Sequence, residues 1–279
     1  MLFRSLWNAT EEIFGQFAVG DYVRIEGTTQ RFQGAIQVII KKITKVDSSE
    51  VNQEDFKRTV LVDRMKLRSR LMEILRGMNT PVLVNLAECF FFDDDFMERF
   101  CRAPAGIKLH HAYEGGLLDH TVAMLETASR IIPLYPSLNG DLLLTGVFLH
   151  DIGKIEELSY DSEMAYTDSG QMLGHPVLAL GMLQEKIHET EKLSEERFDP
   201  ELAMLLKHLL ISHHGTYEHG SPKLPMTLEA VALHSIDSLD SKLAEFEKYM
   251  FEDPNSGSPW TNYLPAIERK LYKGKNHKS

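Results

Sequence analysis

The segment LLLTGVFLHDIGK, residues 142–154, decides how the fold is interpreted, because an uninterrupted apolar run ends directly in two polar residues. An apolar run of this kind predicts a buried helix. The end of that helix would present the imidazole of His150 and the carboxylate of Asp151 side by side. Such neighbours can share one ion, so the segment predicts a metal site at the end of a buried helix.

Further candidate ligands stand where helices are expected to begin or end: His120, His175, His213 and His214. In an expected helix near 227–250, Asp237 and Asp240 are three residues apart and therefore share one face. Apolar residues surround them, and a carboxylate there is costly unless it is paired or bound to metal. Imidazole and carboxylate ligands suit Mn, Fe, Co, Mg or Zn, so the metal stays open. Two such divalent ions would polarise a phosphodiester and acidify a bridging water to hydroxide, which gives hydrolysis without a protein nucleophile.

The composition is that of a folded protein, with 43% apolar and 25% charged residues. The apolar runs are far shorter than the roughly 20 residues that cross a bilayer, and the start lacks a signal-peptide core, so we expect a cytoplasmic protein. Cys89 and Cys101 are too few for a disulfide framework and are expected to be buried thiols. The net charge of −11 is uneven, because residues 1–72 carry 12 Lys and Arg against 9 Asp and Glu. The acidic remainder can still act on phosphates if bound ions neutralise its carboxylates.

The chain divides into a small β module and a helical body. β-branched residues between Gly20 and Val46, with Gly27 and Gly34 as turn markers, predict strands. A short hairpin is expected between Glu156 and Thr167. Apolar periodicity predicts helices near 57–76, 80–90, 118–132, 140–150, 171–192, 199–212, 227–250 and 260–271. We expect a mainly α fold in four parts: a β module at 1–50, a linker and helix at 51–78, an all-helical domain at 79–255, and a C-terminal helix and tail at 256–279.

The chain resembles the HD superfamily of metal-dependent phosphohydrolases through motifs in the family's order: GGLLDHT (115–121), FLHDIGK (148–154), LGHP (173–176), ISHHG (211–215) and HSIDSLDSK (234–242). The resemblance implies a first ion held by His120, His150, Asp151 and Asp237. It implies a second ion held by Asp151, His175 and His213. His214 would assist the second ion or contact phosphate, and the pair leaves open which imidazole is the ligand. Lys154 stands where HD enzymes place a lysine on the scissile phosphate, so it would stabilise charge in the transition state.

A closer resemblance is to the YhaM-type 3′-to-5′ exoribonucleases, which join an amino-terminal OB-fold to an HD domain. It is carried by SLWNATEE (5–12), VGDYVRIEG (19–27), FQGAIQVIIKKI (32–43), KLHHAYEGGLLDHT (108–121), SYDSEMAYTDSGQMLGHP (159–176) and the whole of 211–242. It implies single-stranded RNA, or DNA, as the substrate. Only residues 1–46 precede the connector, fewer than the five strands of an OB-fold need. Either Met1 is an internal methionine of a longer protein, or this member has lost part of the fold.

The partial OB-fold leaves two expectations. Trp7, Tyr22 and Phe32 are candidate base-stacking residues, although packing within the module explains each of them better. A strand edge left exposed by the incomplete module favours a homo-oligomer.

Other positions carry weaker expectations. His111 and Gly116 belong to a loop that would cover the site and touch substrate, although a plain turn explains the glycine equally well. His234, one turn before Asp237, is a candidate partner that orients it. His208 is expected to be structural.

Two other functions stay open. A hydrolase of small nucleotides would need no groove that follows a strand. A non-catalytic RNA-binding regulator agrees less well with the sequence, since every expected ligand position is filled.

Overall fold

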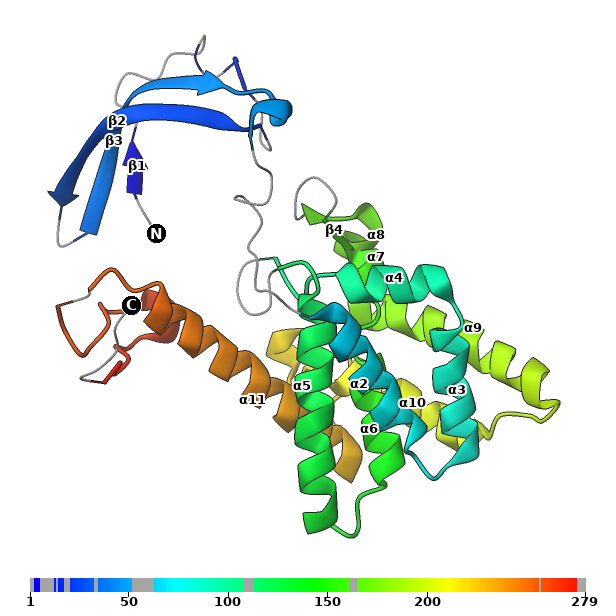
Figure 1. Cartoon of the computed structure of the whole chain (residues 1–279). Helices are drawn as coiled ribbons and strands as arrows, with labels where there is room; N and C mark the ends of the chain where they lie inside the picture. The colour runs from blue at the N-terminus through cyan, green and yellow to red at the C-terminus, as the bar shows by residue number, and fades with distance from the viewer. Residues whose placement is uncertain are drawn as a thin grey trace. The chain divides into compact units, whose positions relative to one another are not determined.

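The structure is a computed structural model that describes residues 3–5, 13, 15–17, 21–32, 35–51, 63–107, 113–160, 165–255 and 257–274 (Figure 1). The chain forms two compact units. One consists of residues 1–57 with 243–279, and the other of residues 58–242.

The first unit contains a three-stranded sheet made of β1 (Phe3–Ser5), β2 (Val23–Phe32) and β3 (Ala35–Lys45), in the order β1-β3-β2. β2 and β3 are antiparallel, and β1 is parallel to β3. A bulge lies at Glu26 and Gly27, where a Cβ on Gly27 would lie 2.2 Å from the carbonyl oxygen of Ile39. The small amino-terminal β module is thus confirmed, whereas its relation to an OB-fold stays a prediction. Trp7 lies outside the described residues.

The helix predicted at 260–271 is wrong. Among the described residues of this stretch only a 3₁₀ turn, η5 (Pro265–Ile267), is helical. Isolated bridges join Trp260 to Tyr272 and Leu264 to Arg269. Pro265 cannot donate a helical hydrogen bond, so it breaks a helix in the middle of the stretch.

The second unit is helical, as predicted. Its helices are α2 (Arg64–Arg76), α3 (Pro81–Phe91), α4 (Asp94–Arg102), α5 (Gly116–Ile131), α6 (Gly140–Leu149), α7 (Lys154–Glu157), α8 (Asp168–Leu173), α9 (His175–Ser194), α10 (Pro200–Ser212) and the part of α11 (Leu228–Phe251) up to Lys242. This unit also contains the 3₁₀ turns η3 (Ile132–Leu134) and η4 (Tyr217–His219), whereas η1 (Ser48–Glu50) belongs to the first unit. No helix among the described residues has the length and apolar character that crossing a bilayer requires.

Side-chain caps fix where several of these helices begin. Asp63, Asp93, Asn139, Thr167 and Asp199 each accept a hydrogen bond from a backbone N–H in the first turn of the following helix. One expected helix, 171–192, is in fact two. Gly174 has a φ of 73° between α8 and α9, a conformation that ends one helix before the next begins.

The core surrounds α6, whose residues Leu142–Leu149 are all buried. The ring of Phe148 lies 5.4 Å from that of Phe90 and 5.7 Å from that of Phe100, centroid to centroid. This aromatic cluster fixes α6 among α3 and α4. The residues that follow α6, His150 and Asp151, are therefore held rigidly inside the domain.

The predicted hairpin is present as β4 (Leu158–Ser159) and β5 (Ala165–Tyr166), which pair antiparallel directly after α7. The hydroxyl of Thr167 donates to the carbonyl oxygen of Glu156 at 2.7 Å. The hairpin thereby returns the chain to α7 before α8 begins.

Candidate metal centre

A first group of ligand atoms gathers at the end of α6. His120 comes from α5, and its Nε2 lies 3.4 Å from Nε2 of His150 and 3.5 Å from Oδ1 of Asp237 on α11. Nε2 of His150 lies 3.3 Å from Oδ2 of Asp151. Two helices, α5 and α11, and the turn after α6 thus bring two imidazoles and two carboxylates together.

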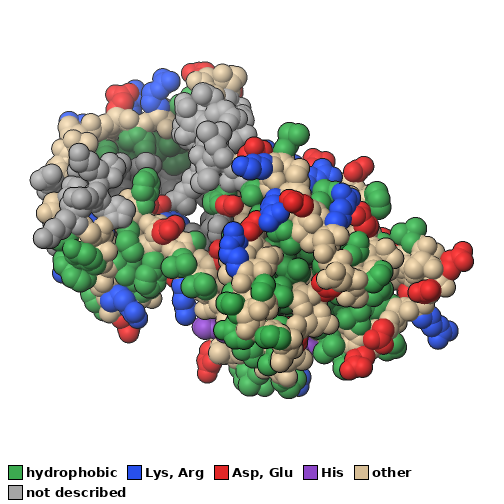
Figure 2. Space-filling view, turned by 60° about the horizontal axis from the view of Figure 1, so that its bottom comes forward, with side chains coloured by type: hydrophobic (Ala, Val, Ile, Leu, Met, Phe, Trp, Pro, Cys, Tyr) green, Lys and Arg blue, Asp and Glu red, His purple; other side chains and the backbone are tan. Residues whose placement is uncertain are grey.

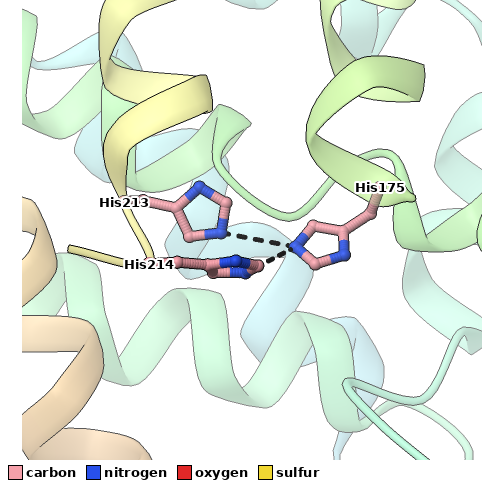
Figure 3. A group of neighbouring side chains, drawn as sticks. All are labelled: His175, His213 and His214. Carbon is pink, nitrogen blue, oxygen red and sulfur yellow. Dashed lines mark hydrogen bonds between the residues drawn. The ribbon is translucent and has the colours of Figure 1, made fainter. Parts of the chain in front are cut away.

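A second group consists of His175, the first residue of α9, with His213 and His214, which follow α10 (Figure 3). Nε2 of His175 lies 3.3 Å from Nε2 of His213 and 3.1 Å from Nε2 of His214. The three rings point toward one another from two helix ends.

Asp151 lies between the two groups. Its Oδ2 faces His150, and its Oδ1 lies 3.3 Å from Nε2 of His175 and 3.8 Å from Nε2 of His213. Asp151 is only 3% exposed, so water does not compete strongly for these oxygens. One carboxylate therefore offers one oxygen to each group.

Hydrogen bonds fix the orientation of the imidazoles from behind. Nδ1 of His120 lies 2.7 Å from Oδ2 of Asp240, and Nδ1 of His175 lies 3.1 Å from both carboxylate oxygens of Glu157. Nδ1 of His150 and of His213 face the carbonyl oxygens of Val147 and Leu210 at 2.7 and 2.6 Å. Since each Nδ1 faces an acceptor, it carries a proton, and Nε2 is the nitrogen that each ring directs into the cluster.

This arrangement fits divalent metal ions. In the second group, lone pairs that face each other at 3.1–3.3 Å repel unless a cation lies between them. Metal–nitrogen bonds of about 2.0–2.1 Å place neighbouring ligands at about that separation. Among the described residues, His120 with His150 and Asp151, and His175 with His213 and His214, are the two groups whose spacing suits an ion.

Residues 117–242 match the HD domain family. The chain is 35% identical to the 3′-5′ exoribonuclease YhaM of Bacillus subtilis (strain 168) over 276 residues, which cover 98% of this chain and 84% of that protein. It is 33% identical to the 3′-5′ exoribonuclease YhaM of Bacillus pumilus (strain SAFR-032), with the same coverage. The chain belongs to the YhaM family. No solved structure matches the chain significantly.

As a YhaM-family chain with an HD domain, this protein is a metal-dependent hydrolase, and its ionisation states suit that chemistry. Burial raises the pKa of Asp151, but Lys154 and His150 more than offset it and bring the pKa well below its usual range. Burial lowers the pKa of His213 well below its usual value and that of His214 to about 4. At neutral pH these groups are thus a carboxylate and two neutral imidazoles, the forms that bind metal.

His120 differs from the other imidazoles. Burial lowers its pKa, but hydrogen bonds to Asp237 and Asp240 overcome this effect and raise it to about 9. Without an ion, His120 is therefore protonated at neutral pH. Its extra proton supplies positive charge beside the carboxylates of Asp237 and Asp240.

Lys154 lies at the edge of the cluster. Its Nζ donates to Oδ2 of Asp151 at 2.6 Å, and its side chain is 12% exposed. Burial alone would lower its pKa, but the carboxylate of Asp151 more than offsets this effect. The pKa of Lys154 is therefore raised above its ordinary value, and the side chain stays protonated. An ammonium group thus lies beside the carboxylate that both groups share.

The remaining expected residues are placed as follows. Gly116 is buried at the start of α5, and its N–H donates to the carbonyl oxygen of Tyr113 at 2.9 Å. Its role in substrate binding stays a prediction, and His111 lies outside the described residues. His208 accepts from the N–H of Met226 at 3.0 Å, which is a structural role.

His234 does not contact Asp237 in the way that was expected. Its Nδ1 lies 2.8 Å from the carbonyl oxygen of His213, so it holds the loop that carries the two neighbouring histidines. Gly215 lets the ring approach, because a Cβ there would lie 2.1 Å from Cε1 of His234. The imidazole thus supports the second group rather than the first.

Sequence reasoning missed Glu157 and assigned no role to Asp240. The spacing of Asp240 from Asp237 was a usable signal, because both share one face of α11. Glu157 offers no such signal, since only the fold of the hairpin places it behind His175. Figure 2 shows very little histidine surface on the face drawn, and His120, His150, His175 and His213 are all buried.

Proposed function

We propose that this chain is a 3′-to-5′ exoribonuclease that hydrolyses phosphodiester bonds of single-stranded RNA with two divalent metal ions. One observation carries the two-ion proposal: the two oxygens of Asp151 face separate groups of histidines. The similarity to two exoribonucleases along nearly the whole chain supports the substrate and the direction of cleavage.

The proposed ligands of the first ion are His120, His150, Asp151 and Asp237, and those of the second are Asp151, His175 and His213. The hydrogen bond from Nδ1 of His213 to Leu210 supports His213 as a ligand, because it fixes the Nε2 lone pair toward Asp151. Nδ1 of His214 is buried without a partner in the described part of the chain. His214 therefore has a less constrained ring, which suits a contact to phosphate or to the second ion.

Bound divalent ions would supply Lewis-acid chemistry, since they withdraw charge from a phosphodiester and acidify water. The protein's own groups hold and orient the reactants. Asp151 is buried and ionised, and the ammonium of Lys154 beside it would stabilise negative charge that develops on the phosphate. The cysteines have no part in this chemistry: Cys89 is buried, and burial raises the pKa of the Cys101 thiol.

The test is hydrolysis of 5′-labelled single-stranded RNA with Mn²⁺, by the native chain and by Asp151→Asn. We expect a ladder that shortens from the 3′ end and that the substitution abolishes. Asp168→Asn is the matched control, because Asp168 is an exposed carboxylate in the first turn of α8, outside both groups. Intact RNA beside a hydrolysed mononucleotide panel would contradict the proposal.

A further inference from the structure

Basic residues collect in one segment of this acidic chain. Residues 57–76 carry seven Lys and Arg against two Asp and Glu, although the chain as a whole has a net charge of −11. Most of these basic residues lie on α2, the first helix of the helical unit. The position of α2 therefore determines where this positive charge lies in the helical unit.

The beginning of α2 lies beside the beginning of α5 (Figure 1). A Cβ on Gly115, the residue before α5, would lie 3.3 Å from Cδ of Arg64. The N–H of Gly115 donates to the carbonyl oxygen of Arg102 at 2.9 Å, so the end of α4 meets the same point. His120 follows Gly115 by five residues, about 7.5 Å along α5. Arg64 and Arg102 are thus at the end of the bundle that holds the metal ligands.

Two guanidinium groups meet one carboxylate at this point. Glu114 lies between two guanidinium groups, 2.9 Å from Nη1 of Arg64 and 3.2 Å from Nε of Arg102. Arg68, one turn after Arg64, has no acidic partner among the described residues. Arg64 and Arg68 are both close enough to the Cys101 thiol to favour its ionised form and lower its pKa against the effect of burial. We call Arg64, Arg68 and Arg102 the arginine rim.

Other arginines near the rim are neutralised by their own partners. Arg70 pairs with Glu73 and Glu126, Arg76 with Glu88, and Arg99 with Glu156. The rim combines three guanidinium groups, two of which pair with Glu114. It also continues toward the site, because Arg99 of α4 donates to the carbonyl oxygen of Ile155, the residue after Lys154, at 2.8 Å.

We propose that the arginine rim binds the phosphodiester backbone of the RNA strand on the 5′ side of the bond that is cleaved. The inference rests on the proposed function. Guanidinium groups bind phosphate in pairs of hydrogen bonds without reading the base, which suits an enzyme that must pass over any sequence. Nucleotides upstream of the 3′ end would lie on the rim while the terminal phosphodiester lies beside Lys154 and Asp151.

The experiment compares Arg68→Ala with the native enzyme in Mn²⁺, on a 12-nucleotide RNA and on a dinucleotide. The dinucleotide has one phosphodiester, which occupies the metal centre and cannot reach the rim. The loss of one phosphate contact to a single strand makes the plot of log binding constant against log salt concentration shallower by about 0.7. At 0.1 M salt this difference corresponds to about five-fold weaker binding. We expect kcat/KM for the longer RNA to fall about five-fold, with a shallower salt dependence, while dinucleotide hydrolysis is unchanged.

Two further variants make the result specific. Arg68→Lys should retain most of the activity, because it keeps the charge. Arg130→Ala is the matched control: Arg130 is an exposed arginine at the opposite end of α5, paired with Glu126 as Arg64 is with Glu114. Arg68 is exposed and has no ion pair among the described residues, so we expect the Arg68→Ala variant to fold normally.

The outcomes separate the two proposals. If the native enzyme cuts both substrates and Arg68→Ala keeps the native kcat/KM and salt dependence on the longer RNA, the rim is not a binding surface and the proposed function stands. If the native enzyme cuts neither substrate, the proposed function fails, and the rim proposal fails with it.

Discussion

Two imidazoles in the metal centre, His120 and His175, hold their Nδ1 against a carboxylate rather than a backbone carbonyl. A carboxylate partner makes the opposite nitrogen a stronger donor to metal. Of the two carboxylate partners, Asp240 and Glu157, Glu157 makes the additional contact, because it also accepts from the backbone N–H of His175 at 2.9 Å. It fixes both the ring and the start of α9.

Glu157→Ala should therefore weaken metal binding at the second group by about 10- to 100-fold, as the loss of such partners does elsewhere. Calorimetric titration with Mn²⁺ measures this directly. Glu156→Ala is the control, since Glu156 pairs with Arg99 at 2.7 Å instead. Equal loss in both variants would show that Glu157 has no specific part in metal binding.

Metal binding should also release a proton from His120. Its pKa of about 9 in the metal-free protein lies above neutrality, so an ion must displace a proton from this ring. Affinity should rise with pH up to about 9 and then level off. Calorimetry in two buffers of different ionisation enthalpy counts the protons, and a count of zero at pH 7.5 would contradict the raised pKa.

At this scale the sequence was a good guide to candidate ligands and a poor guide to their supports. The seven positions from His120 to Asp237 that lie in the two groups were chosen from the order of the motifs, and most of them from their expected places at helix ends. Glu157 could not be chosen, because its partner is eighteen residues away and a hairpin lies between them. His234 was expected to orient Asp237 because of its helical spacing. Its Nδ1 instead faces the carbonyl oxygen of His213 in the loop after α10.

Among the elements, α7 and α9 approach each other at Gly153. A Cβ on this residue would lie 2.1 Å from the carbonyl oxygen of His175 and 2.8 Å from the N of Ala179. Gly153 stands between Asp151 and Lys154, so the close approach is what lets α9 present His175 to the shared carboxylate. Backbone atoms on both sides leave nothing that can move away easily.

Gly153→Ala should lower the free energy of unfolding by about 1–3 kcal/mol, the usual cost of overpacking, and should reduce metal binding. Gly181→Ala on α9 is the matched control, because a Cβ there meets nothing within 4 Å. It should raise stability by about 0.5–1 kcal/mol through helix propensity. Urea denaturation measures both changes, and equal midpoints for the two variants would contradict the close approach.

Long apolar helices were predicted well, whereas short helices and helix breaks were not. α4 was missed because its apolar residues, Phe96, Met97 and Phe100, occupy a short segment among charges. The helix expected at 260–271 followed apolar spacing alone and ignored Pro265. The break at Gly174 depends on a positive φ that spacing does not reveal.

For the whole molecule, the buried cluster predicts that metal ions stabilise the fold. Ions at 100 times their Kd add about 2.7 kcal/mol to the free energy of unfolding. In a unit of this size that corresponds to an increase of about 5–10 °C in Tm. Thermal melts after EDTA treatment and after Mn²⁺ addition test this, and Asp151→Asn should respond much less. An equal shift in that variant would mean that the ions stabilise the protein elsewhere.

The division into a β module and an HD domain was accessible from composition and motifs. What the sequence could not provide is the boundary within α11, since contacts assign residues from 243 onward to the first unit while the helix itself continues to Phe251. The apolar periodicity of α11 runs without a break across this boundary, so the sequence pattern does not mark it. Only contacts between residues distant in the sequence assign the two parts of the helix to different units.

The two groups of ligands on either side of Asp151 differ in their number of carboxylates, and this difference affects how activity would depend on the concentration of free metal ions. The first group has Asp237 in addition to Asp151, whereas the second combines Asp151 with the imidazoles of His175, His213 and His214. With the ligands proposed, the second ion would be held less firmly and would leave first when free ions become scarce. Turnover would then follow the concentration of available metal, so that RNA degradation would slow under metal limitation before the fold itself is affected.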